Sequence, residues 1–188
     1  MIRAAVLSLC AVAAFAGAPA SAAEVAGVTL KDTAQVAGQR LVLNGAGLRT
    51  KVIFNVYVAS LYVPAKAADL TAVLAAGPRR VQLNLLRTLA AEQLIEAFDE
   101  GLKDNNTAAE LAATKAGRAQ MTTIMKGFGE VKEGNVVSLD FADGATTISF
   151  NGKARGTIAG EEFNTALMKI WLGAKPVQPD LKKALLGG

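Results

Sequence analysis

The segment from Val52 to Val63 constrains the fold more than any other part of the chain. It is rich in β-branched and aromatic residues, and both alternating sets of its side chains are largely apolar. Successive side chains of a strand point to opposite faces of a sheet, so this pattern predicts a strand covered on both faces.

Two glycines and an arginine precede this strand. Gly45 and Gly47 lack side chains, so another backbone or a ligand could approach closely there. Arg49 carries a permanent charge beside a strand that we expect to be buried, so it needs a partner. That partner could be an anionic ligand or an acidic side chain such as Asp140 or Glu162.

Residues 1–23 have the features of a cleavable secretory signal peptide. Arg3 is followed by a short apolar run and then by small residues. The run is too short to span a membrane, and the small residues resemble a signal-peptidase site. We expect cleavage after Ala22 or Ala23, a periplasmic location without a stable membrane anchor, and one mature domain over 24–188.

Two residue types are missing from the expected mature domain. The chain has no histidine, and its single cysteine, Cys10, lies in the signal segment. This composition excludes histidine-based acid–base catalysis, thiolate nucleophiles, disulfides, and metal sites built on histidine or cysteine. Any chemistry must come from Arg, Lys, Tyr, Ser, Thr, Asp or Glu, and we expect no metal and no cofactor.

The charge balance does not favour nucleic acid as a partner. Loss of Arg3 with the signal leaves 19 of the 20 basic residues and all 16 acidic residues, a net charge of about +3. This excess is small and dispersed, unlike the basic patch of a nucleic-acid-binding protein. The sequence says nothing about oligomeric state.

The other patterns predict an α+β domain with strands first, then helices, a β-meander and further helices. Strands are expected over 28–30, 39–43, 81–85, 136–141, 146–150 and 153–158. The dipeptides Asp143-Gly144 and Asn151-Gly152 predict hairpins between the last three strands. Apolar residues at helical spacing predict helices over 67–75, 90–103, 107–127, 161–172 and 179–186.

Four motifs spread along the chain carry a resemblance to a known family. The first is Gly-x-Gly-x-Arg-x-Lys at 45–51, followed by Val-Tyr-Val-Ala-Ser-Leu-Tyr-Val. The others lie at 79–94, 160–163 and 170–183. Together they resemble the secreted bacterial branch of the chalcone isomerase-like family. The resemblance implies an antiparallel sheet with helices packed on one face, an open-faced sandwich with a pocket between the two layers.

The resemblance also implies a site. In the enzymes of the family, an arginine matching Arg49 stabilises negative charge as a phenol oxygen adds to an enone. Other plant-enzyme positions correspond here to Tyr57, Leu94, Gly101 and Ile170, and the last three lack polar groups. Arg49 with Tyr57 instead resembles the non-catalytic, fatty-acid-binding branch, in which an arginine and a tyrosine hold a carboxylate.

We therefore expect Arg49 and Tyr57 to bind a ligand, with Tyr62 and Arg87 as further candidates. In one straight strand, Arg49 and Tyr57 would be on the order of 26 Å apart, so a turn near Thr50 must bring them together. Each candidate also has a structural interpretation. The tyrosines could be core residues, and Arg87 could be a solvated strand end.

Three functions are compatible with the sequence. The favoured one is a periplasmic, non-catalytic protein that binds a small apolar carboxylate, such as a fatty acid, between sheet and helices. The second is a structural or partner-binding envelope protein whose pocket is closed and whose Arg49 is internally paired. The third is an intramolecular isomerase or lyase of chalcone isomerase type, with Arg49 as its catalytic residue and a hydroxyl or carboxyl group handling the proton.

Overall fold

The structure is a computed structural model that describes residues 23–188, so nearly all of the expected signal peptide lies outside the described part. A seven-stranded antiparallel sheet has its strands in the order β3-β4-β5-β6-β7-β8-β9. The strands are β3 (Thr33–Val36), β4 (Gln39–Lys51), β5 (Phe54–Val63), β6 (Arg79–Leu85), β7 (Val136–Ala142), β8 (Ala145–Phe150) and β9 (Lys153–Ala159). A separate small hairpin consists of β1 (Ala23–Val25) and β2 (Val28–Leu30).

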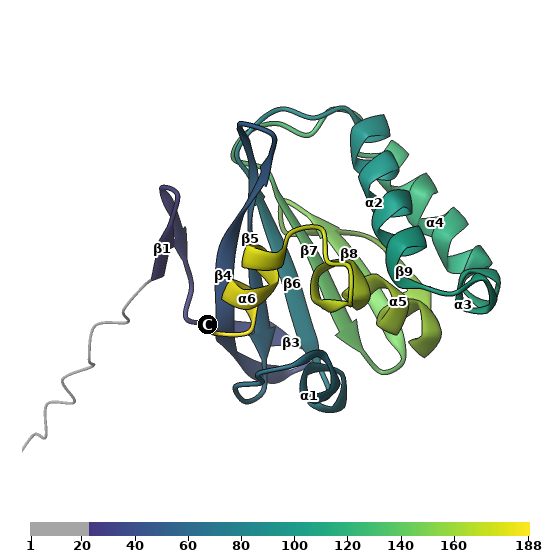
Figure 1. The fold of residues 1–188 in the computed structure, drawn as a ribbon, viewed down its shortest axis with the longest axis horizontal. Coiled ribbons are helices and arrows are strands. Elements are labelled where there is room, and N and C mark those ends of the chain that lie inside the picture. Colours follow the sequence, from purple (N-terminus) through teal and green to yellow (C-terminus); the bar gives the residue numbers. More distant parts are fainter. Residues whose placement is uncertain (1–22) are drawn as a thin grey trace, which may run out of the picture.

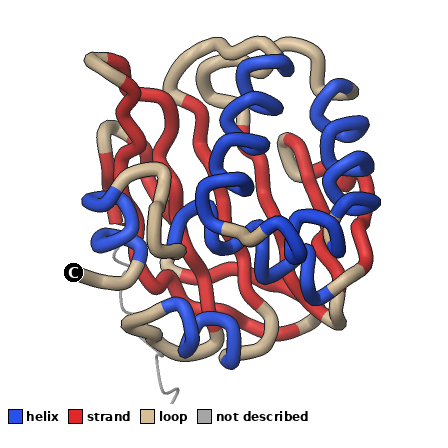
Figure 2. Tube along the Cα trace, turned by 45° about the vertical axis from the view of Figure 1, so that its right-hand side comes forward, coloured by secondary structure: helices blue, strands red, loops and turns tan. Residues whose placement is uncertain are grey.

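The helices lie over one face of the large sheet (Figures 1 and 2). They are α1 (Leu70–Ala75), α2 (Ala91–Asn105), α3 (Ala108–Ala113), α4 (Lys115–Lys126), α5 (Glu161–Leu172) and α6 (Pro179–Leu185). The main hydrophobic core lies between this face and the helices. Helix α5 contributes buried side chains from each of its turns. The expected α+β architecture, an antiparallel sheet with helices on one face, is confirmed.

The strand at β5 is buried on both faces over its second half, as its composition predicted. From Val58 to Val63 every residue is at most 1% exposed. The first part of the predicted strand is different, because Val52 and Ile53 form the turn of the β4–β5 hairpin and are 90% and 83% exposed. The turn of the hairpin lies at the upper end of the sheet in Figure 1, to the left of α2.

Strand β4 extends eight residues beyond the predicted strand over 39–43. Its glycines Gly45 and Gly47 face α6. A Cβ atom on Gly45 would lie 2.0 Å from the backbone oxygen of Ala184. Of the two interpretations of these glycines, the close approach of another backbone is the one that the structure shows.

The predicted helix over 107–127 is two helices, α3 and α4, divided at Thr114. Its capping box is present, with Thr107 and Glu110 bonded reciprocally. The buried Thr114 hydroxyl donates to the backbone oxygen of Glu110 at 2.9 Å, and the chain changes direction there. The hairpins at Asp143-Gly144 and Asn151-Gly152 form as predicted. Within residues 23–188 no helix is long and apolar enough to cross a membrane.

Candidate functional site

Arg49 and Tyr57 are direct partners across the β4–β5 hairpin. The turn that brings them together is at Val52 and Ile53, slightly later than the expected position near Thr50. Residues paired across an antiparallel ladder have Cβ atoms about 5 Å apart on the same face. Tyr57 packs against the main core, so both side chains start from the face that the helices cover.

Trp171, near the end of α5, orients the Tyr57 hydroxyl. Its indole Nε1 donates a hydrogen bond to the Tyr57 oxygen at 3.2 Å. An indole N–H can only donate, so the Tyr57 oxygen is the acceptor and its own proton remains available. No acceptor for that proton exists among the described residues. Trp171 is 5% exposed, so it is a core residue as expected, and it also has this polar contact.

Burial raises the pKa of Tyr57 above its usual value of 10.0. The Trp171 hydrogen bond and the positive charge of Arg49 act in the opposite direction, but burial has the larger effect. The hydroxyl therefore remains protonated at physiological pH and can donate a hydrogen bond.

Arg49 is held only by neutral oxygens. It is partly buried, and its Nη1 donates to the backbone oxygen of Thr50 and to Oε1 of Gln178, the latter at 3.4 Å. Gln178 is itself fixed to β4, since its Oε1 accepts from Thr50 N at 2.9 Å and its Nε2 donates to Leu48 O at 3.2 Å.

The predicted internal ion pair of Arg49 is not formed, because no acidic side chain within residues 23–188 lies in ion-pair contact with it. Asp140, one of the two expected partners, is held by Arg80, with an Nη2 to Oδ2 distance of 2.6 Å. Glu162, the other expected partner, lies in the first turn of α5. The guanidinium and the Tyr57 hydroxyl therefore form a cluster of donors without a carboxylate.

An apolar and partly exposed surface adjoins these donors. Leu85 is opposite Tyr57 on β6 and is buried, whereas Leu83, two residues away on the same face, is only partly buried. Leu94 and Ile95 of α2 are also partly buried. Apolar side chains on the helix-covered face of the sheet thus remain accessible beside Tyr57.

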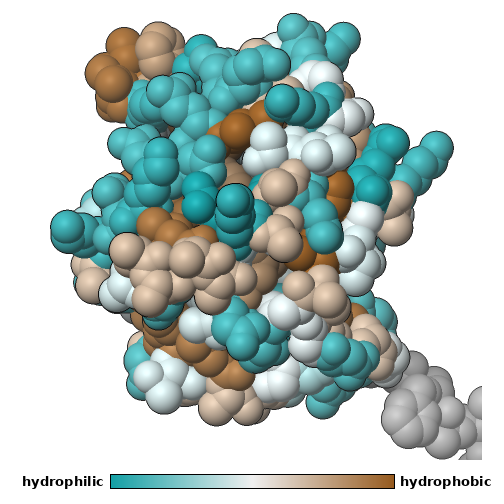
Figure 3. Space-filling model, turned by 90° about the vertical axis from the view of Figure 1, so that its right-hand side faces the viewer, coloured by the Kyte–Doolittle hydropathy of each residue, from teal (hydrophilic) through white to brown (hydrophobic). Residues whose placement is uncertain are grey.

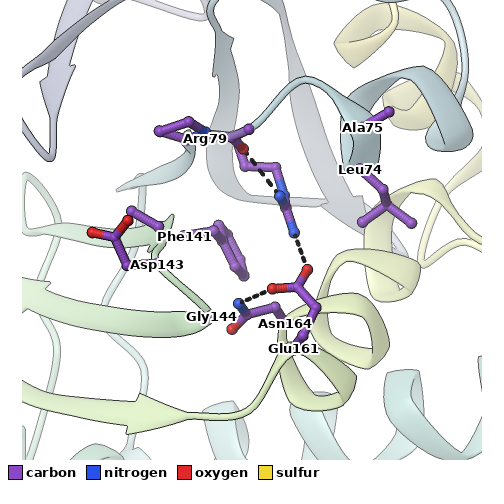
Figure 4. A pocket seen from close by; sticks show the side chains of 11 residues that line it. Leu74, Ala75, Arg79, Phe141, Asp143, Gly144, Glu161 and Asn164 are labelled. Atoms are coloured by element: carbon purple, nitrogen blue, oxygen red, sulfur yellow. Dashed lines mark hydrogen bonds and ion pairs between the residues drawn. The ribbon is translucent and has the colours of Figure 1, made fainter.

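Two pockets of the described residues lie elsewhere. One has a volume of about 330 Å³ and is lined in part by Arg79, Phe141, Glu161 and Asn164 (Figure 4). Arg79 is 3% exposed and pairs with Glu161 at 3.6 Å, while its guanidinium lies 5.1 Å from the centre of the Phe141 ring. The second pocket, of about 270 Å³, lies between α3 and α5. Neither pocket is lined by Arg49 or Tyr57.

The other two site candidates do not join this cluster. Tyr62 lies on the opposite face of the sheet, 1% exposed, and packs with Val36 and Leu41. Arg87 stacks over the ring of Phe54 at 4.4 Å, close to the hairpin turn. The structure thus brings Arg49 and Tyr57 together and adds Trp171 and Gln178, which the sequence did not identify as partners of the site.

Two of the apolar positions to which the resemblance assigned plant-enzyme site residues, Gly101 and Ile170, contact each other. A Cβ atom on Gly101 would lie 2.9 Å from Cγ2 of Ile170, so α2 packs closely on α5 at this point. Leu94 adds another apolar side chain. These three positions offer no proton donor or acceptor to a substrate at Arg49.

Comparisons with known proteins identify a family and a solved structure of similar fold. A family model described as chalcone isomerase-like matches residues 22–187. Among solved structures, the chain is similar to the crystal structure of a fatty-acid binding protein from Arabidopsis thaliana, with a TM-score of 0.68 and 14% sequence identity. The similarity covers 85% of this chain and 92% of that chain. No curated protein matches the sequence. At this identity, the structural similarity establishes a shared fold.

Proposed function

Because the chain belongs to the chalcone isomerase-like family, we propose that it is a periplasmic, non-catalytic binding protein for a small apolar carboxylate such as a fatty acid. One observation carries the proposal. The Arg49 guanidinium and the Tyr57 hydroxyl come from paired positions, and no acidic side chain of the described residues neutralises them. The fatty-acid binding protein of similar fold from Arabidopsis thaliana supports the ligand class.

A carboxylate matches this group of donors. The planar guanidinium can donate two parallel hydrogen bonds to the two carboxylate oxygens. The Tyr57 hydroxyl supplies a third donor, because Trp171 already occupies its oxygen as a hydrogen-bond donor. An aliphatic tail would extend over the partly exposed apolar surface at Leu83.

A binder is favoured over an isomerase because no proton-handling side chain replaces those of the plant enzymes. The matching positions Leu94, Gly101 and Ile170 are apolar. Two hydroxyls lie near Arg49. Thr50 shares the Gln178 Oε1 acceptor with Arg49, and Tyr57 is a weak acid because its pKa is raised.

The test is isothermal titration of the mature protein with dodecanoate. Removal of a charge-assisted hydrogen bond costs about 1.5–3 kcal/mol, so Arg49→Met should weaken binding about 10- to 150-fold. Tyr57→Phe removes one neutral donor and should weaken it about 2- to 12-fold. Arg40→Met is the matched control, since Arg40 is an exposed arginine on the same strand. Equal affinity in wild type and Arg49→Met would contradict the proposed site.

The tail and the headgroup can be tested separately with the methyl ester of dodecanoate. The ester keeps the apolar tail but has no charge, so it should bind the wild type weakly and show no difference between wild type and Arg49→Met. An ester that binds as tightly as the acid would mean that Arg49 does not recognise the carboxylate.

The periplasmic part of the proposal rests on residues 1–23. Intact-mass measurement of the protein from a periplasmic extract should give a chain that begins at Ala23 or Glu24. A full-length mass, or protein found only in the cytoplasmic fraction, would contradict this assignment.

A further inference from the structure

The turn of the β4–β5 hairpin exposes three consecutive large apolar side chains. Val52, Ile53 and Phe54 are 90%, 83% and 51% exposed, and within residues 23–188 they are the large hydrophobic residues with this degree of exposure. We call these three residues the apolar tip. The hydrophobic cluster at the upper left edge of Figure 3 is at the end of the molecule where this hairpin projects in Figure 1.

The residues of this turn are unfavourable for its backbone conformation. Val52 has a positive φ of 58°, which is unfavourable for a β-branched residue. The other tight turns with positive φ in the described part of the chain place a glycine in the pair: Ala26-Gly27, Ala37-Gly38, Asp143-Gly144 and Asn151-Gly152. At this turn the chain has instead two β-branched apolar residues, which favour neither the backbone conformation nor exposure to water.

Positive charge surrounds the apolar tip. Lys51 precedes it and is exposed, and the Arg87 guanidinium lies 4.4 Å from the centre of the Phe54 ring. The loop before β7 forms a β-bridge between its Val131 and Leu89, and it contains the charged residues Glu130, Lys132 and Glu133. Glu130 and Lys132 lie 4.0 Å apart and offset each other. Lys51 and Arg87 are thus the cations that directly border the apolar tip.

We propose that the apolar tip inserts reversibly into the surface of an anionic lipid bilayer, while Lys51 and Arg87 contact lipid phosphates. Apolar side chains bordered by cations match the boundary between acyl chains and anionic headgroups. A protein partner fits less well, because a stable protein interface needs about 800 Å² on each side, far more than three residues on a narrow hairpin offer. This inference does not depend on the carboxylate site, since neither Arg49 nor Tyr57 belongs to the apolar tip.

The test is co-sedimentation of the mature protein with vesicles of phosphatidylethanolamine and phosphatidylglycerol, and with vesicles of phosphatidylcholine alone. The wild type should bind the anionic vesicles more tightly, and added salt should weaken binding. The double variant Val52→Gly with Ile53→Ser should lose binding at least tenfold. Its melting temperature should be unchanged or higher, because glycine suits the positive φ and serine suits an exposed turn.

A matched pair of charge reversals separates local from overall charge. Lys51→Glu should weaken binding to anionic vesicles more than fivefold. Lys31→Glu makes the same change in net charge at an exposed position just before β3, which pairs with the opposite end of β4, and should have little effect. Equal binding by the wild type and the double variant would overturn the proposal, as would the absence of wild-type binding to anionic vesicles. A wild-type dimer that becomes monomeric in the double variant and does not bind vesicles would also overturn it, since a second copy would then cover the tip.

Discussion

At the scale of single residues, Trp171 determines what Tyr57 can offer a ligand. A phenol hydroxyl can donate or accept, and the indole N–H at 3.2 Å fixes the Tyr57 oxygen as an acceptor. The phenol proton then remains available for donation to a ligand. A tryptophan that would otherwise be only a core residue thus makes the tyrosine a directed donor.

The two tyrosines of the chain should ionise only at high pH while the protein is folded. Burial raises the pKa of both Tyr57 and Tyr62 above 10.0. The folded state therefore favours the neutral phenols, and this contribution to stability is complete below pH 10 and is lost as the pH rises through the folded pKa values. Tyrosinate absorbance should appear at higher pH in native protein than in guanidinium chloride.

The variant Tyr57→Phe provides the control for this titration. It leaves Tyr62 as the one tyrosine in the chain, so the native titration should keep its raised midpoint at half the amplitude. A native midpoint at or below that of the unfolded chain would contradict the buried placement of the hydroxyls.

The sequence singled out Arg49 and Tyr57 and required a turn between them, but it could not place that turn. The two turn residues between them, Val52 and Ile53, have strong strand preference, so the hairpin turn has no local signal. The contact from Trp171 to Tyr57 spans 114 positions, and residue spacing gives no information on contacts of that range. The structure places Tyr62 apart from Tyr57, because an odd separation on one strand places two side chains on opposite faces.

At the scale of elements, the contact between α6 and β4 is close enough to be tested by single methyl groups. A Cβ atom on Gly47 would meet Cβ of Ala184 at 2.8 Å and Cδ1 of Leu181 at 3.0 Å. A Cβ atom on Gly45 would lie 2.0 Å from the backbone oxygen of Ala184. The end of the Leu181 side chain can rotate aside, whereas Cβ and the backbone oxygen of Ala184 both move only with their helix, and the contact with the oxygen is the closer one.

Gly45→Ala should therefore destabilise the protein more than Gly47→Ala. We expect the Gly47 variant to lose about 1–3 kcal/mol of unfolding free energy through overpacking, and the Gly45 variant to lose more because α6 must shift. Urea denaturation followed by circular dichroism measures both. The variants control for each other, since they make the same change on the same strand face. Equal losses would mean that α6 does not sit as closely on β4 as described.

Element boundaries were predictable where local chemistry decides them. The hairpins at Asp143 and Asn151 and the capping box at Thr107 depend on side chains within a few residues of each other, and all three form. The length of β4 depends on α6, which covers Gly45 and Gly47 from the far end of the chain. Its second half was therefore missed, as tertiary contacts determine it.

At the scale of the whole molecule, one ion pair makes the stability of the folded protein depend on pH in the acid range. Lys169 of α5 donates to Glu110 of α3 at 2.6 Å. This hydrogen bond, with those from Thr107, lowers the pKa of Glu110 from 4.5 to about 2. The folded state thus favours the ionised carboxylate, and this contribution is complete above pH 4.5 and is lost as the pH falls from 4.5 toward 2.

The variant Glu110→Gln should flatten the acid side of the stability profile. Its melting temperature should fall less steeply than that of the wild type between pH 4.5 and 2, while Glu100→Gln, a matched change at an exposed position of α2, should follow the wild-type slope. Differential scanning calorimetry across this range gives both slopes. Parallel profiles for wild type and Glu110→Gln would show that the ion pair does not contribute to acid stability.

The placement of Gln178 has a consequence for how molecules of this protein meet one another. β3 covers only the start of β4, so within residues 23–188 no strand pairs with the outer edge of β4 at Leu48 and Thr50. The Gln178 amide accepts from Thr50 N and donates to Leu48 O, and these are the two bonds that a peptide group of an adjoining strand would make. The Gln178 side chain thus satisfies the edge hydrogen-bonding groups of β4 in place of a strand. It blocks the position at which a strand of a second molecule would begin to pair with the sheet.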